Sequence, residues 1–246
     1  MNTRLLVTSL VVAIALPAAH SEQLTVQNAG FETLFLANNT FNVSSPGPAG
    51  WSAYGSINHN NRSIGALNPT GSTLYSGGAP EGRNVGVVFL MDNANNQSQF
   101  ASIESGLVQT LSATLLTNTR YTLTVEVGNM APDATPNNNA FAFTGFPGYR
   151  IDLLAGGQVI ASDNNSLLPA EGTFLTSQFS LSIGASHVLA GQALGIRLVN
   201  LNAGPGIEVN FDNVRLDATA IPEPATVTSL LGAATLMMAF FRRRGR

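Results

Sequence analysis

Side chains able to carry out acid, base or nucleophilic chemistry are scarce in this chain. It has no cysteine, and its histidines are His20, His59 and His187. None of these histidines lies in a spacing typical of a catalytic triad or a zinc site. Glutamates supply carboxyl groups, but no motif pairs two of them as glycoside hydrolysis requires; they include Glu81, Glu104, Glu126, Glu171 and Glu208. The sequence therefore predicts no catalytic residue and a non-catalytic protein.

Aromatic side chains offer a second kind of chemistry, because a flat ring can stack on a sugar when polar groups flank it. The candidates are Trp51, Tyr54, Tyr75 and Tyr149, and Trp51 is the only tryptophan. Tyr54 and Tyr75 lie in or beside polar loops, so we expect them to be the better candidates for ligand binding. Weak binding of a polysaccharide is the activity that these rings predict.

The charge balance narrows the choice of partner. Residues 21–222 hold thirteen Asp and Glu against six Arg, a net charge of −7, and the chain has no lysine. An acidic surface without a basic stripe argues against nucleic acid and anionic lipid as partners. Without cysteine, an exported domain must be held together by core packing or by a metal.

Alternating apolar and polar residues predict short β-strands between residues 22 and 220, and helical periodicity is absent there. The strand from Arg120 to Gly128 has the clearest alternation, and Gly156-Gly157 predicts a hairpin turn. A change of phase at Asp212-Asn213 predicts a β-bulge. Residues 38–49 and 58–82 are rich in polar and turn-forming residues and are expected to be loops. The other expected strands are Leu24–Asn28, Asn84–Leu90, Leu107–Leu111, Gly148–Ala155, Phe174–Ile183, Leu194–Leu201 and Ile207–Leu216.

Nine or ten such strands predict an all-β, antiparallel β-sandwich, for which the jelly roll is the commonest connection. The opening motif Asn28-Ala29-Gly30-Phe31-Glu32, the later Gly50-Trp51 and the closing Phe211-Asp212-Asn213-Val214 resemble galactose-binding-like jelly rolls, including several carbohydrate-binding module families. The resemblance implies a structural Ca²⁺ at Glu32 and Asp212, with hydrogen bonding at strand ends as the alternative, and it makes Trp51 a core residue.

The two ends of the chain have the composition of targeting segments. Residues 1–21 have Arg4, an apolar run and small residues, as a signal peptide does, with cleavage before Glu22 or after Ala19. Residues 221–246 contain an apolar run from Ala225 to Phe241, which at ~1.5 Å per residue predicts a single, short transmembrane helix.

The order of Pro222, Glu223 and Pro224, the apolar run, and then Arg242, Arg243 and Arg244 resembles the PEP-CTERM sorting signal of Gram-negative bacteria. That resemblance implies processing by an exosortase and loss of the helix, and a plain tail anchor is the alternative. The protein would be transiently anchored in the inner membrane and then reach the cell surface or extracellular matrix.

Taken together, these features predict an exported, exosortase-sorted surface or matrix protein with a non-catalytic binding domain associated with exopolysaccharide. A purely structural matrix or adhesion protein is the alternative. A glycan-active enzyme is the weakest of the three hypotheses.

Overall fold

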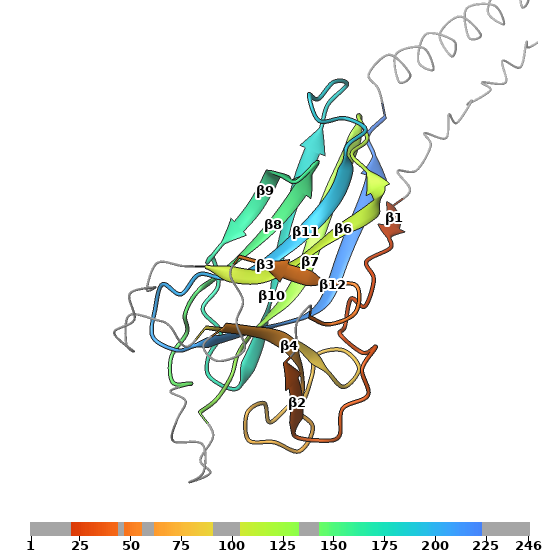
Figure 1. The fold of residues 1–246 in the computed structure, drawn as a ribbon. Coiled ribbons are helices and arrows are strands. Elements are labelled where there is room, and N and C mark those ends of the chain that lie inside the picture. The colour runs from red at the N-terminus through yellow and green to blue at the C-terminus, as the bar shows by residue number, and fades with distance from the viewer. Residues whose placement is uncertain (1–20, 44–46, 56–61, 91–103, 133–142, 223–246) are drawn as a thin grey trace, which may run out of the picture.

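The computed structural model describes residues 21–43, 47–55, 62–90, 104–132 and 143–222, and these form an antiparallel all-β protein (Figure 1). No helix occurs in these ranges, and so none there could span a membrane. The strands are β1 (Ser21–Leu24), β2 (Thr40–Val43), β3 (Ser52–Tyr54), β4 (Arg62–Asn68), β5 (Val85–Leu90), β6 (Ser105–Thr114), β7 (Thr119–Asn129), β8 (Tyr149–Ala155), β9 (Gln158–Asn164), β10 (Thr173–Ile183), β11 (Ala193–Asn200) and β12 (Glu208–Ala220).

The strands form two sheets that lie face to face. The seven-stranded sheet has the order β10-β7-β12-β5-β4-β2, with β1 paired to β12, and the five-stranded sheet has the order β3-β6-β11-β8-β9. From β5 to β12 the chain passes repeatedly between the two sheets, so neighbours in a sheet are distant in sequence. The fold can therefore bring together residues that no local motif connects.

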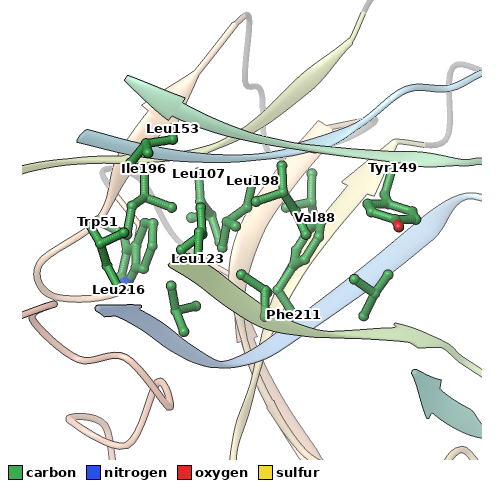
Figure 2. Close-up of a cluster of buried hydrophobic side chains, with 14 of the residues drawn as sticks. Trp51, Val88, Leu107, Leu123, Tyr149, Leu153, Ile196, Leu198, Phe211 and Leu216 are labelled. Carbon is green, nitrogen blue, oxygen red and sulfur yellow. The ribbon is translucent and has the colours of Figure 1, made fainter. Parts of the chain in front are cut away.

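The core lies between the sheets and is built by the inward half of each alternating strand. Figure 2 shows Val88, Leu123 and Phe211 from one sheet packed against Leu107 and Ile196 from the other. Each of these side chains is buried. At about 25 cal/mol per Å² of apolar surface, such packing is the main stabilising contribution available to a domain without disulfides.

Several local predictions are confirmed. β8 and β9 pair through the turn at Gly156 and Gly157, both with positive φ. The register of β12 against β7 shifts between Asp212 and Arg215, which is the expected bulge.

The prediction that residues 38–49 and 58–82 are loops was wrong in part. β2 lies inside the first loop and β4 inside the second, where β4 is buried along its whole length. Strand β4 shows no alternation of polar and apolar residues in the sequence, because both of its faces are covered. The described residues contain twelve strands, more than the nine or ten expected.

The predicted signal peptide falls almost wholly outside the described residues, as does the apolar run Ala225–Phe241. Of the sorting motif, only Pro222 is described.

Candidate active site

Two of the aromatic residues expected to bind sugar are parts of the core. Trp51 is buried, its ring stacks on Phe31 at 5.6 Å between centroids, and its Nε1 donates to the Asn28 carbonyl. Tyr149 is fully buried, and its hydroxyl donates to Asp163 at 2.6 Å. Neither ring presents a face to solvent, because Tyr149 points from β8 into the core and Trp51, just before β3, packs against Phe31. Neither ring is placed to stack on a sugar in this structure, and the buried position of Trp51 is the one that the resemblance implied.

Tyr54 lies on the outer face of the five-stranded sheet, where other side chains already occupy its ring and hydroxyl. Arg197 stacks 4.3 Å from the ring centroid, and the hydroxyl donates to Glu104 at 2.7 Å. Arg150 donates to both oxygens of Glu104, at 2.6 and 2.8 Å, and to the buried Asp152 at 3.1 Å. The hydrogen bond from Arg150 lowers the pKa of Glu104. Opposite charges pair throughout this network, so its role is to stabilise the sheet.

The fourth aromatic, Tyr75, lies with a different set of polar residues, on the outer face of the seven-stranded sheet. Val209 and Phe211 of β12 point into the core, so Glu208 and Asn210 point outward. Glu208 lies opposite Phe89 of β5, and Asn210 lies between β5 and β7. This face therefore carries polar groups in the middle of a sheet.

Residues 69–84 cross this outer face and place Tyr75 on it. Only 1% of Tyr75 is exposed, its ring lies 4.4 Å from that of Phe174, and its hydroxyl donates to Asn210 Oδ1 at 2.7 Å. Gly128 makes this packing possible, since a Cβ there would lie 2.7 Å from the Tyr75 hydroxyl oxygen. The backbone N–H of Ala131 donates to the Leu74 carbonyl and fixes the crossing segment to the end of β7.

Apolar and aromatic side chains surround these polar groups and form a second hydrophobic cluster, separate from the core. Its buried members are Leu67, Tyr75, Val85, Val87 and Met130. Partly buried residues pack against it, including Leu74, Phe89, Phe143 and Phe174. Small-molecule sites are lined mainly by apolar and aromatic side chains with a few polar groups, and this cluster has that composition. We call Glu208, Asn210, Tyr75, Phe89 and Phe174 the candidate active site.

Glu208 is the group of this site that can exchange a proton near neutral pH. Its side chain is buried, and Oε1 accepts a hydrogen bond from Asn210 Nδ2 at 2.9 Å. Burial raises the pKa of Glu208 to about 7, although the hydrogen bond from Asn210 opposes that rise. Burial, with the nearby Glu208 carboxylate, also raises the pKa of Tyr75 well above its usual value. A carboxylic acid of this pKa can donate a proton near pH 7 and take one back.

Of the two predicted calcium ligands, Glu32 lines a separate groove of about 550 Å³ together with Gly30 and Glu81, and Asp212 lies next to Asn213 of its lining. Glu32 Oε1 accepts the backbone N–H groups of Arg83 and Asn84 at 2.7 and 2.6 Å. Asp212 Oδ2 accepts the N–H of Glu81 at 2.8 Å. These hydrogen bonds match the alternative that we gave for both residues.

The donor set at this groove also suits a hard cation. A Cβ on Gly30 would lie against the Glu81 carboxylate and 3.6 Å from Asp212 Oδ1, so the two carboxylates share one cradle. Burial raises the pKa of Asp212 to about 8, and the negative charges of Glu81 and Glu32 contribute to the rise. Oxygen ligands of this kind fit Ca²⁺. Within the described ranges, however, no three Asp, Glu or His side chains are close enough together to hold a metal as they stand.

No sequence motif distinguishes Glu208 from the other glutamates. Its partners, Asn210 and Tyr75, are 2 and 133 positions away, and no motif joins the three. One signal was present in the sequence, because the alternation of Ile207, Val209 and Phe211 places Glu208 on the opposite face of the strand. Only the fold shows that this face is covered.

Comparisons with known proteins connect the chain to enzymes. The HpiC1 cyclase family model matches residues 22–217. The structure of a Stig cyclase, Fisc, from Fischerella sp. TAU in complex with (3Z)-3-(1-methyl-2-pyrrolidinylidene)-3H-indole is 34% identical, with a TM-score of 0.73, over 82% of this chain and 100% of that one. A cyclase from Fischerella sp. TAU in complex with 4-(1H-indol-3-yl)butan-2-one is 36% identical, with a TM-score of 0.72, over 82% and 100% of the two chains. No curated protein matches.

These matches overturn the functional predictions from the sequence. A non-catalytic matrix protein with an exosortase and a polysaccharide as partners is wrong, because the match covers nearly all described residues and its relatives are cyclases that bind small molecules. The resemblances to PEP-CTERM proteins and to carbohydrate-binding modules gave the wrong family, since they rested on a short C-terminal segment and on motifs at the two ends of the domain. The chain belongs to the HpiC1 cyclase family.

Proposed function

We propose that this protein is a cyclase that closes a ring in a small, indole-bearing molecule by acid catalysis, with Glu208 as the proton donor. The observation that carries the proposal is a buried carboxyl group with a pKa of about 7 beneath aromatic side chains. The indole ligands of the two related cyclases support the choice of substrate class.

The proposed step is an isomerisation and needs no co-reactant. The Glu208 O–H bond breaks, and its proton adds to an unsaturated atom of the substrate, which becomes a cation. A π bond elsewhere in the same molecule then supplies the electron pair for the new ring bond. Loss of a proton from the ring product to the Glu208 carboxylate restores the acid, so atoms and charge balance.

The surroundings of Glu208 favour such a step. The faces of the partly exposed rings Phe89 and Phe174 can stabilise a transient cation through their π electrons, by about 0.5 to 2 kcal/mol each. The apolar neighbours exclude water that would otherwise add to the cation. A neutral acid also binds next to an apolar substrate at a lower desolvation cost than a carboxylate would.

The test is conversion of a panel of prenylated and alkylated indoles by the purified full chain, followed by chromatography for products of unchanged mass. Glu208→Gln should lower the rate by about 10²- to 10⁴-fold, the usual contribution of a positioned acid. Glu126→Gln is the matched control, because Glu126 lies on the neighbouring strand and bonds the exposed Thr176. Full activity in Glu208→Gln would refute the role of Glu208.

We also propose that Ca²⁺ binds between Glu32, Glu81 and Asp212, drawing these side chains closer together than they lie in this structure. It would stabilise the fold by joining the turn after β1, the segment 69–84 and strand β12. Calcium at a hundredfold excess over its Kd would add about 2.7 kcal/mol to the free energy of unfolding. Melting with and without a chelator should then differ by several degrees in wild type and not in Asp212→Asn. Equal melting curves for wild type would leave the hydrogen bonds as the whole role of these residues.

We also propose that the two sheets are connected as a jelly roll. A jelly roll is supported by the strand order, since β5-β12-β7-β10 in one sheet and β6-β11-β8-β9 in the other correspond to its two four-stranded halves. Export through a signal peptide in residues 1–21 also remains a prediction, and the N-terminal residue of the secreted protein would test it.

A further inference from the structure

The hydrogen bonds around Glu208 distinguish its two carboxyl oxygens. Asn210 Nδ2 donates to Oε1 of Glu208 at 2.9 Å and to the Gly86 carbonyl oxygen at 3.2 Å. The Asn210 Oδ1 accepts from the Tyr75 hydroxyl at 2.7 Å. Asn210 is fully buried, so these contacts are not in competition with solvent.

The orientation of the Asn210 amide is determined by its neighbours. A carbonyl oxygen can only accept, so the amide atom that faces Gly86 must be the nitrogen. Rotating the amide would place two oxygens against each other and leave the Tyr75 hydroxyl facing an NH₂ group. The same nitrogen that is fixed by Gly86 is the one that reaches Glu208 Oε1.

From this arrangement we infer that Asn210 and Tyr75 are positioning residues, which reserve Oε1 of Glu208 as an acceptor and leave Oε2 as the oxygen that carries the proton to the substrate. The inference rests on the proposed function, because it concerns the direction in which that acid donates. Neither residue has to touch the reacting atoms.

No charged group competes for this role among the described neighbours of Glu208. On β5 the residues of the same face are Val87 and Phe89, and β7 contributes Gly128, none of which titrates. Tyr75, from the segment 69–84, is the titratable neighbour, and its raised pKa keeps it neutral. The hydrogen bond from Asn210 is therefore the polar contact that favours the carboxylate of Glu208.

The test measures the titration of Glu208 directly, without a substrate. ¹³C NMR of the glutamate carboxyl carbons in the full chain, with the Glu208 signal assigned by its loss in Glu208→Gln, gives the pKa in each variant. Asn210→Leu has a similar volume and no donor, so it should raise the pKa of Glu208 by about one unit, the size expected for losing a hydrogen bond to a charged group. Tyr75→Phe keeps the ring against Phe174 and should raise the pKa by less.

Kinetics with a converted indole provide the second readout. Both variants should lower kcat about tenfold with little change in KM, and the alkaline limb of the rate profile should move to higher pH. A Glu208 pKa near 7 that stays unchanged in the folded variants would overturn the inference and leave the proposed function intact. A wild-type Glu208 that titrates in its ordinary range would instead contradict the proposed function. If Asn210→Leu fails to fold, the pKa of Glu208 in Tyr75→Phe tests the inference.

Discussion

The outer faces of the two sheets each hold a buried carboxyl group. One of these groups is paired with arginines, and the other has neutral neighbours. On the five-stranded sheet, Asp152 is fully buried and pairs with Arg197 at 2.7 Å and Arg150 at 3.1 Å. On the seven-stranded sheet, the described contacts of Glu208 are neutral: the Asn210 amide and the aromatic rings around it.

The difference separates a structural acid from a reactive one. Two arginines pair with Asp152 and offset its charge, so this carboxyl group belongs to a structural ion-pair network. Burial without a counter-charge favours the protonated form of Glu208 and raises its pKa to about 7. Unpaired burial of this kind costs stability and is typical of functional sites.

Disrupting the ion pairs of Asp152 should have the largest effect on the free energy of unfolding. Asp152→Asn removes the common partner of Arg150 and Arg197, which are only 20% and 15% exposed. Arg150 keeps Glu104, but Arg197 is left without a carboxylate partner among the described residues, which should lower the free energy of unfolding by about 3 to 5 kcal/mol. Urea unfolding measures it, with Asp217→Asn on the half-buried part of β12 as the control. Equal losses in the two variants would mean that the network contributes little.

Removing the carboxyl group of Glu208 should have the opposite effect and raise the free energy of unfolding above neutral pH. The folded pKa of Glu208, about 7, lies above its ordinary value of 4.5, so the folded state holds the extra proton between these pH values. Stability from this group is therefore lost as pH rises from 4.5 to 7, by about 3 kcal/mol in total. Glu208→Gln removes that dependence. At pH 8 it should be more stable than wild type, whereas at pH 4.5 the two should be alike.

Thermal or urea unfolding of both proteins across pH 4.5 to 8 measures this difference. Asp212 also has a raised pKa, but it is present in both proteins and cancels from the comparison. A variant that is less stable than wild type at pH 8 would show that Glu208 has a counter-charge.

The smallest effect concerns the fit of Tyr75 over the reactive face. Gly128→Ala would place a methyl group 2.7 Å from the Tyr75 hydroxyl oxygen and against Phe174, so the ring must move. Overpacking of this kind costs about 1 to 3 kcal/mol, and we expect activity to fall about tenfold. Gly77→Ala is the matched control, because a Cβ there meets no atom within 4 Å. Equal activities of the Gly128→Ala and Gly77→Ala variants would show that catalysis does not depend on the position of Tyr75.

Sequence patterns predicted the fold more fully than the site, and the reason is physical. Alternation in Arg120–Gly128 and the phase change at Asp212 depend on neighbouring residues, so β7 and the bulge of β12 could be expected. Covering of one face by another segment leaves no local pattern, which is why β4 was expected to be loop and Glu208 was not selected. Tyr75 was named for sugar stacking, but its buried ring and its bond to Asn210 depend on a contact across 135 residues.

The most direct test of the account is a crystal structure of the full chain with 4-(1H-indol-3-yl)butan-2-one, the indole seen in a related cyclase. We predict that the indole ring lies on the outer face of the seven-stranded sheet, in contact with Phe89 and Phe174 and beside the Glu208 carboxyl group. An indole seated instead against Tyr54 and Arg197 on the other sheet, or in the cavity lined by Phe31, Leu34 and Ala66, would contradict the central claim.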